Sequence, residues 1–174
     1  TNIFERSDAE VLALEGLQPR TGILRGSPPE VITIDEEGLH FAVSVAHGHK
    51  TGVYLDQRDN RRLVRECSNG ADVLDCFCYT GGFALNAAAG GARSVLAIDA
   101  SAGALEGAQA GASLNGEAAQ RVQWLEDDVF QSLRRLRDHA RRFDLIVLDP
   151  PKFAPTAAHA PRAARAYKDI NLLA

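Results

Sequence analysis

The sequence predicts an α/β fold built on an open, doubly wound parallel sheet. Four short segments are almost continuously apolar: residues 72–77, 94–99, 122–127 and 143–149. Segments with helical character separate them: residues 81–90, 101–115 and 129–141. Apolar strands that alternate with helices belong to a parallel sheet that is covered on both faces. Right-handed crossovers then place ligands at the carboxyl ends of the strands.

We expect this sheet to be incomplete. Four strands are fewer than a doubly wound domain usually has. The last residues, "KDINLLA" (168–174), continue a helical pattern. The expectation is therefore either a fragment or a sheet that another chain completes.

Residues 1–66 have a different, β-rich character. β-type alternation marks residues 31–34 and 39–45, and "DEEG" between them has the composition of a hairpin turn. We expect a further short strand at "VYL" (53–55), a helix over 57–66 capped by Asp56, and a short helix at 7–16. The predicted domains are a small β-rich module with a connecting helix (1–66) and a larger α/β domain (67–174).

The composition is that of a globular protein without a membrane segment. Hydrophobic residues make up 45% of the chain and charged residues 24%, and no apolar run approaches the roughly 20 residues that span a bilayer. Three cysteines, Cys67, Cys76 and Cys78, cannot all pair, and we interpret them as reduced. We expect a cytoplasmic location, no membrane partner and no metal site, since His47 and His49 have no cysteine or carboxylate at ligand spacing.

Arginines cluster in two places although the net charge is −4. The clusters are Arg58–Arg65 and Arg134–Arg142. Local clusters of this kind can bind phosphates. For residues 134–142 we favour a solvated helix face.

Carboxylates stand at the ends of all four predicted strands: Asp75, Asp99, Asp127 with Asp128, and Asp149. A single strand-end carboxylate is often a helix cap, but four around one rim favour a binding site. The first turn has only Gly81-Gly82, with neither a P-loop lysine nor a three-glycine fingerprint. A polyphosphate or dinucleotide ligand is therefore disfavoured.

The rim suits a ligand that has hydroxyls and a cationic group but no phosphate. Asp99, 17 residues after Gly82, is placed to accept hydrogen bonds from ribose hydroxyls. Asp128 or its backbone could meet an adenine amino group, and Asp75 would lie under a cationic amino-acid end. These properties describe S-adenosylmethionine.

The segment "DPPKF" (Asp149 to Phe153) follows the fourth strand, where a transferred methyl group would lie. Its two prolines stiffen the loop by fixing φ. Asp149 and the loop carbonyls can hydrogen-bond to a base edge, and Phe153 could stack on a flipped base. Pro150-Pro151 alone could be a strand terminator, but after a strand-end carboxylate we favour a loop that binds the target base.

Four blocks of sequence together resemble the class I methyltransferases that modify C5 of a cytosine in large-subunit ribosomal RNA. The blocks are "TGVYLDQRDNR", "LDCFCYTGGFALNAAAGGA", "DLIVLDPPKFA" and "AYKDINLLA". They occur in the family's order, and the likeness covers the chain from about Arg6 onward. "DPP" alone is shared with amino-group nucleic-acid methyltransferases, but its combination with "GHKTGVYLDQRDNR" is specific.

The resemblance implies an incomplete Rossmann-like, doubly wound methyltransferase domain preceded by a small β-rich hairpin module. It implies S-adenosyl-L-methionine as the cofactor and ribosomal RNA as the substrate, hence RNA binding and rRNA processing. A homodimer is left open.

The resemblance also assigns roles to residues of the predicted site. The segment that would close over the methionine part of the cofactor contains Tyr54, Gln57 and Arg58. The methionine end would be held by Asp75 and the turn that follows it: Phe77, Tyr79, Thr80, Gly81 and Gly82. Ribose would be bound by Asp99 with Ala100, and adenine would lie by Asp127, Asp128 and Val129. The target-base site, which also borders the cofactor at Asp149, would be lined by Asp149, Pro150, Pro151, Lys152 and Phe153. Near the same rim, Lys168 and Asp169 would start the next helix.

Two features of the family fall outside residues 1–174: an N-terminal RNA-binding module and a nucleophilic cysteine on a later strand. That thiolate adds to C6 of cytosine, so that C5 can attack the methyl group. We therefore expect this chain to carry the cofactor site but not the catalytic cysteine.

Two alternatives stay open. One is a methyltransferase acting on an exocyclic amine of a base, in which "DPP" itself would carry the chemistry. The other is a non-catalytic module that binds cofactor or RNA. A dehydrogenase is disfavoured because the three-glycine fingerprint is absent.

Overall fold

The computed structural model describes residues 1–7, 11–46, 53–154 and 156–174. It contains two compact units, which are described separately below. The smaller consists of Thr1–Ile34 and Ala42–Tyr54, and the larger of Asp35–Phe41 and Leu55–Ala174. The domain boundary predicted between residues 66 and 67 stays a prediction, although residues 55–66 group with the larger unit.

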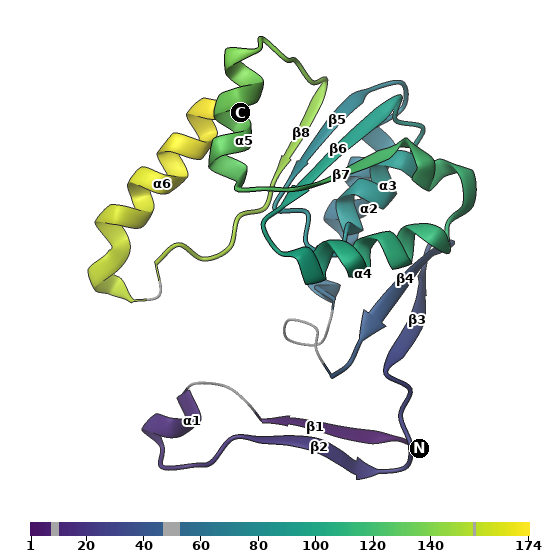
Figure 1. The fold of residues 1–174 in the computed structure, drawn as a ribbon, viewed down its shortest axis with the longest axis vertical. Coiled ribbons are helices and arrows are strands. Elements are labelled where there is room, and N and C mark those ends of the chain that lie inside the picture. The colour runs from purple at the N-terminus through teal and green to yellow at the C-terminus, as the bar shows by residue number, and fades with distance from the viewer. Residues whose placement is uncertain (8–10, 47–52, 155) are drawn as a thin grey trace. The chain divides into compact units, whose positions relative to one another are not determined.

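Four parallel strands form the centre of the larger unit: β5 (Asp72–Cys76), β6 (Ser94–Asp99), β7 (Val122–Glu126) and β8 (Leu145–Leu148). They lie in the order β7-β6-β5-β8 (Figure 1). In this register Asp75 lies opposite Ala97 on β6 and Val147 on β8. The chain runs outward from β5 to β7 and then returns to the other side of β5. The topological switch point therefore lies at the carboxyl end of β5, and the predicted doubly wound sheet is confirmed.

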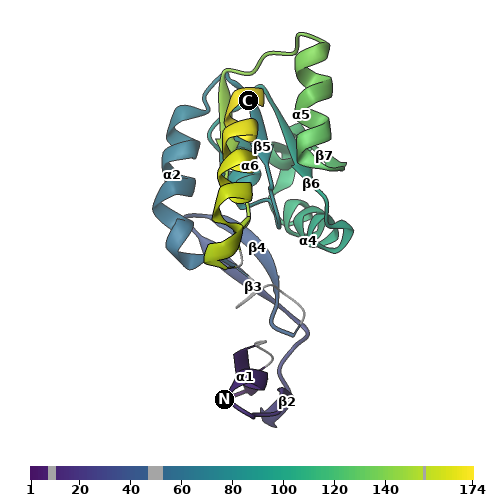
Figure 2. The ribbon, with the colours of Figure 1, turned by 90° about the vertical axis from the view of Figure 1, so that its left-hand side faces the viewer.

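Helices cover both faces of this sheet (Figure 2). The first face packs against α2 (Arg58–Cys67), α3 (Gly82–Ala89) and α4 (Ala102–Ser113). The second packs against α5 (Val129–Asp138) and α6 (Ala160–Leu173). Val73 belongs to the core of the first face and Leu74 to that of the second, because successive strand residues point to opposite faces.

Glycine allows two of these helices to approach closely. A Cβ on Gly90, at the end of α3, would lie 2.0 Å from the carbonyl oxygen of Arg65 in α2. The alanines of α3 are also buried, so this helix lies close to both α2 and the sheet.

Several predicted element ends need correction. α5 ends at Asp138 rather than at residue 141, since Ala140 adopts a left-handed φ of 52°. α6 begins at Ala160, so Lys168 and Asp169 lie within this helix and not at its start. β5, β7 and β8 are shorter than predicted, and a 3₁₀ segment, η2 (Gly116–Arg121), was not predicted.

The connection into α2 also differs from the prediction. Leu55–Gln57 form a 3₁₀ turn, η1, so the strand predicted at 53–55 is wrong. The N-cap of α2 is Gln57, without a side-chain cap hydrogen bond, so Asp56 does not cap the helix. Leu55, the last of the three apolar residues, already belongs to the 3₁₀ turn, and the chain continues from this turn directly into α2.

Two antiparallel pairs of strands precede α2. β3 (Val31–Glu36) and β4 (Leu39–Ser44) form the predicted hairpin, whose turn has positive φ values at Glu37 (53°) and Gly38 (82°). β1 (Ile3–Ser7) pairs with β2 (Arg20–Arg25), which the sequence did not predict. Of the helix predicted at 7–16, α1 (Val11–Leu14) is found, and residues 8–10 lie outside the described residues.

No described helix combines the length and the apolar content needed to cross a bilayer. His47 and His49 lie outside the described residues. Within the described ranges, no three His, Cys, Asp or Glu side chains are grouped so that they could hold a metal ion.

Candidate cofactor and target-base site

The carboxyl ends of the four parallel strands meet at one rim of the sheet. Asp75 lies on β5, Asp99 ends β6, Asp127 directly follows β7, and Asp149 directly follows β8. Backbone hydrogen bonds connect neighbouring strand ends, since the N–H of Asp127 donates to the carbonyl of Asp99 at 3.0 Å. The structure therefore brings together the strand-end carboxylates that the sequence singled out.

Asp75 is a buried carboxylate with no hydrogen bond. Its exposed fraction is 1%, and neither carboxylate oxygen has a hydrogen-bond partner among the described residues. Burial raises the pKa of Asp75 to about 8, and the charges of Asp149 and Asp99 add to this rise. The nearby backbone N–H of Ala84 opposes it, although its geometry falls short of a hydrogen bond. Leaving such a group unpartnered costs free energy, so this position suits a cationic donor from a ligand.

The turn after β5 has a strained backbone. Phe77, Tyr79 and Gly81 have left-handed φ values of 61°, 50° and 75°. A Cβ on Gly81, the N-cap of α3, would lie 2.4 Å from the ring of Trp124, so only glycine fits this position. Non-glycine residues in this region persist where the surroundings hold them, often at functional sites.

Asp99 connects this turn to β6. Its Oδ2 accepts a hydrogen bond from the backbone N–H of Tyr79 at 2.8 Å, and its Oδ1 accepts one from the N–H of Ser101 at 2.9 Å. Each carboxylate oxygen has a further lone pair. Asp99 can therefore accept hydrogen bonds from two ligand hydroxyls while the backbone holds it in place.

The carboxylates after β7 serve α5. Asp127 accepts a hydrogen bond from Ser132 Oγ and pairs with Arg135. Asp128 is the N-cap of α5, where its Oδ1 accepts from the N–H of Gln131 at 2.8 Å. These side chains are therefore engaged, and a contact with adenine would use the backbone of residues 127–129.

The three candidates around the start of α2 are Tyr54, Gln57 and Arg58. Gln57 accepts a hydrogen bond from Asn60 at 2.7 Å, and the Arg58 guanidinium lies 3.8 Å from the Asp59 carboxylate. Tyr54 belongs to the smaller unit. The charge of Asp56, beside Gln57, acts on Asp149 at the rim, and contacts of Tyr54, Gln57 and Arg58 with the cofactor stay a prediction.

An aromatic cluster holds the loop that follows β8. The ring centroid of Phe153 lies 6.3 Å from that of Phe77, 5.8 Å from that of Phe130 and 4.7 Å from that of Tyr167. Because the Phe153 ring packs within this cluster, stacking on a flipped base would require it to leave. That role stays a prediction.

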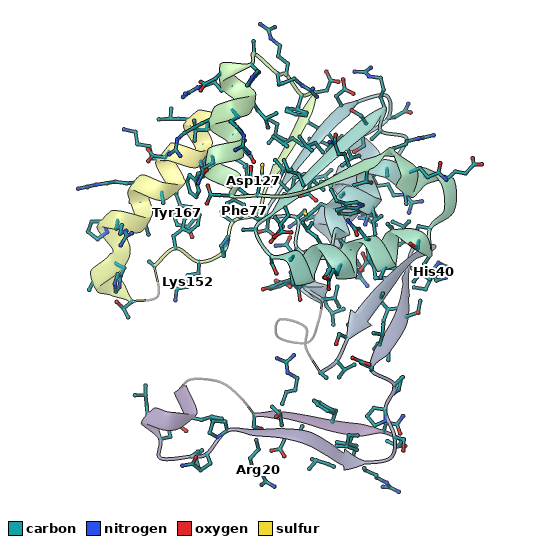
Figure 3. All side chains as sticks on the ribbon, in the orientation of Figure 1. Arg20, His40, Phe77, Asp127, Lys152 and Tyr167 are labelled. Atoms are coloured by element: carbon teal, nitrogen blue, oxygen red, sulfur yellow. The ribbon has the colours of Figure 1, made fainter. Side chains whose placement is uncertain are left out.

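The hydroxyl of Tyr167, on α6, bridges two backbone groups of the same loop. It accepts from the N–H of Phe153 at 3.4 Å and donates to the carbonyl of Pro151 at 3.5 Å. Lys152, between these two residues, is exposed and extends away from the cluster (Figure 3). Desolvation within the loop raises the pKa of Asp149, and the nearby charge of Asp56 adds to this rise.

Two features of the site were missed from the sequence: Tyr167 and a buried ion pair. Arg61 is 4% exposed and donates to both carboxylate oxygens of Glu36, from Nε at 2.7 Å and from an Nη at 2.6 Å. Its side chain lies over Gly82, whose added Cβ would be 3.0 Å from Arg61 Cδ. The ion pair connects the β3–β4 turn to the start of α3. No spacing rule indicates a pairing between residues 25 positions apart.

Known proteins similar to this chain agree in family. Residues 17–167 match the family described as S-adenosylmethionine-dependent methyltransferase. The chain is 49% identical over 175 residues to ribosomal RNA large subunit methyltransferase I of Aeromonas hydrophila, covering 99% of this chain and 44% of that protein. It is 47% identical over 171 residues to the protein of the same name from Alteromonas mediterranea, covering 98% of this chain and 43% of that protein. The chain thus spans less than half the length of these curated relatives.

Solved structures show the same fold. The methyltransferase SMU.776 complexed with SAH matches with a TM-score of 0.73 and 29% identity, over 86% of this chain and 42% of that chain. A SAM-dependent methyltransferase from Agrobacterium tumefaciens matches with a TM-score of 0.72 and 25% identity, over 87% of this chain and 52% of that chain.

Proposed function

The chain belongs to the S-adenosylmethionine-dependent methyltransferase family, and from this premise we propose that it carries the cofactor site of an enzyme that methylates large-subunit ribosomal RNA. The observation that carries the proposal is Asp75 at the switch point of the sheet, a buried carboxylate to which no residue in the described part of the chain donates a hydrogen bond. The ammonium group of the cofactor has the charge and the donors that this carboxylate lacks. The names of the curated relatives support the RNA substrate.

The residues present fit the cofactor. S-adenosylmethionine supplies a methyl group bonded to a cationic sulfur. Asp75 would bind its ammonium group, and Asp99 would accept hydrogen bonds from its ribose hydroxyls. The left-handed turn at Gly81 keeps this part of the rim free of a Cβ. Asp149 and the loop after it would bind the target base.

We further propose C5 of a cytosine as the target atom. In that chemistry a thiolate would bond to C6, and C5 would then take the methyl group from the cationic sulfur, which leaves as a neutral thioether. Transfer of the C5 proton to a base would break the bond between C6 and sulfur and release the thiolate. The cysteines of this chain do not fit the role of that thiolate. Burial, with a smaller contribution from Asp75, raises the pKa of Cys76 to about 12, and burial also raises the pKa of Cys78. Cys67 ends α2, which precedes the amino end of β5 and not the rim. The proposal therefore assigns the thiol to a part of the enzyme outside these 174 residues.

A second candidate is methyl transfer to an exocyclic amine of a base. Asp149 favours it, because an exposed carboxylate directly after β8 can accept a hydrogen bond from an amino group. No thiolate is needed for this reaction.

Calorimetric titration of the chain with S-adenosylmethionine tests the cofactor site, with NADH as the control ligand. We expect saturable binding of S-adenosylmethionine alone. Asp99→Ala should weaken it roughly 10- to 100-fold, since a hydrogen bond to a charged group contributes about 1.5–3 kcal/mol. Failure of a chain shown to be folded by circular dichroism to bind would refute the site.

Tritium release distinguishes the two target atoms. The complete enzyme would be incubated with large-subunit ribosomal RNA labelled with tritium at C5 of cytosine. Methylation at C5 releases one tritium for each methyl group transferred, whereas methylation of the amine releases none. Methyl transfer without tritium release would overturn the C5 assignment and favour the second candidate.

A further inference from the structure

One surface of the larger unit is strongly basic, although the whole chain is acidic. The nine residues from Arg134 to Arg142 contain five arginines and one aspartate, in a chain with a net charge of −4. All five arginines are exposed. Two of them pair with aspartates. The other three, Arg134, Arg141 and Arg142, form no ion pair with any described residue.

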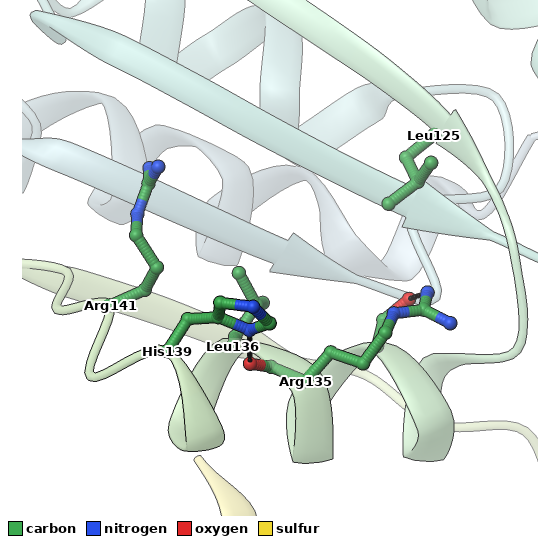
Figure 4. Close-up of a pocket in the computed structure, with 6 residues that line it drawn as sticks. Leu125, Arg135, Leu136, His139 and Arg141 are labelled. Carbon is green, nitrogen blue, oxygen red and sulfur yellow. Dashed lines mark hydrogen bonds between the residues drawn. The ribbon is translucent and has the colours of Figure 1, made fainter.

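A cavity of about 350 Å³ lies at this surface, beside β7 and α5 (Figure 4). Leu125 and Leu136 line it together with the apolar parts of Arg135, His139 and Arg141, whose polar ends lie outside the cavity. The exposure of all five arginines agrees with the solvated helix face that the sequence favoured, and the cavity adds a concave surface beside them.

The structure holds the basic groups around the cavity in place. His139 Nδ1 lies 2.6 Å from the carbonyl oxygen of Arg135. The guanidinium carbon of Arg141 lies 5.8 Å from the ring centroid of Phe143, within the range of a cation–π contact. Groups that are already ordered lose less conformational entropy when they bind an anion.

We propose that this surface, formed by α5 and residues 139–142, binds the phosphodiester backbone of the RNA substrate. The inference rests on the proposed function, because it assigns a binding surface to the same RNA. Planar guanidinium groups match phosphate geometry and stay charged at all relevant pH values.

The position of α5 favours RNA over an acidic protein as the partner. α5 begins at Val129, directly after the rim at the carboxyl end of β7. At a rise of about 1.5 Å per residue, Arg134 and Arg137 lie roughly 8 and 12 Å along the helix. An RNA strand whose target base lies at the rim can therefore reach Arg134 within a few nucleotides. Arg141 and Arg142 precede the amino end of β8, so they lie toward the opposite edge of the sheet and would contact a more distant part of the same strand.

The test compares two double variants that remove the same charge from different helices. Arg134→Gln/Arg141→Gln changes the proposed surface, and Arg162→Gln/Arg165→Gln changes two exposed arginines of α6 that have no described ion pair. The probe is a fluorescein-labelled, single-stranded 20-nucleotide RNA, whose binding is measured by anisotropy between about 50 and 200 mM salt. S-adenosylmethionine titration and thermal melting of each variant report on the cofactor site and on folding.

We expect the α5 variant to bind RNA roughly 25-fold more weakly than the unmodified chain at 0.1 M salt. A plot of the logarithm of the binding constant against the logarithm of the salt concentration should be less steep by about 1.4, because each of the two lost phosphate contacts contributes about 0.7 to the steepness. Its cofactor affinity should not change. Equal losses in both double variants would mean that only the net charge matters, and would overturn the assignment. So would unchanged RNA binding in the α5 variant, or no RNA binding by the unmodified chain.

The outcomes separate this inference from the proposed function. If the α5 variant binds RNA normally while cofactor binding and methyl transfer persist, the RNA-binding role of the α5 surface is refuted and the proposed function stands. If Arg134→Gln/Arg141→Gln does not fold, Arg134→Gln/Arg142→Gln leaves the contact with Phe143 intact and is judged by the same two criteria.

Discussion

The buried carboxylate of Asp75 should make the folded chain less stable as the pH rises. Between pH 5 and pH 8 the unfolded chain has this group ionised, since its ordinary pKa is 3.8. The folded chain keeps it protonated up to a pKa of about 8. Folding therefore takes up one proton, and the free energy of unfolding falls by about 1.4 kcal/mol for each pH unit. Over three units the loss is about 4 kcal/mol.

Asp75→Asn removes this dependence, because an amide carries no charge at any of these pH values. The difference in unfolding free energy, variant minus wild type, should rise by about 4 kcal/mol from pH 5 to pH 8. At pH 5 the variant gains nothing, since its amide is also buried without partners. Urea denaturation followed by circular dichroism at four pH values measures the difference, and titrations common to both proteins cancel.

Asp72→Asn, on the same strand, is the control. Hydrogen bonds from Arg93 and Ser94 lower the pKa of Asp72, so this carboxylate is ionised in both states above pH 5. Its difference from wild type should therefore be constant with pH. An equally constant difference for Asp75→Asn would show that Asp75 is ionised in the folded chain, and the reasoning from burial would be wrong. Asp75→Asn should also lose affinity for S-adenosylmethionine, as read by titration.

Three further predictions concern the supports of the site. Gly81→Ala should lower the free energy of unfolding by roughly 2–4 kcal/mol, from a left-handed φ and a Cβ that collides with an indole ring. Gly70→Ala is the control, because Gly70 has a φ of 72° but nothing within 4 Å of an added Cβ, and it should lower the free energy of unfolding by only about 1 kcal/mol. Equal losses for the two variants in urea denaturation would exclude the collision with the indole ring as the cause. Glu36→Gln should cost about 3–5 kcal/mol by leaving a buried guanidinium without its anion, and a thermal melting temperature equal to wild type would contradict this. Tyr167→Phe should lower kcat for RNA methylation by the complete enzyme roughly three- to tenfold, because the loop after β8 loses its bridging hydroxyl. The dissociation constant for S-adenosylmethionine should not change. A changed cofactor affinity with a normal kcat would reject a role of Tyr167 in positioning this loop.

Local patterns were sufficient to predict the parallel sheet and the residues at its rim. The apolar segments that became β5 to β8, and the glycine pair after β5, are properties of a few neighbouring residues. Once parallel strands are predicted, the residues at their carboxyl ends must share one edge of the sheet. Asp75, Asp99 and Asp149 could therefore be placed together without coordinates.

The state of those residues depended on the tertiary structure. Asp75 has a raised pKa because the packed domain excludes water from it, and Asp127 is engaged by Arg135 from the next helix. The packing of Phe153 beside Tyr167 depends on where α6 lies. These contacts join residues on different elements, and periodicity along the chain carries no information about which side chains meet across them.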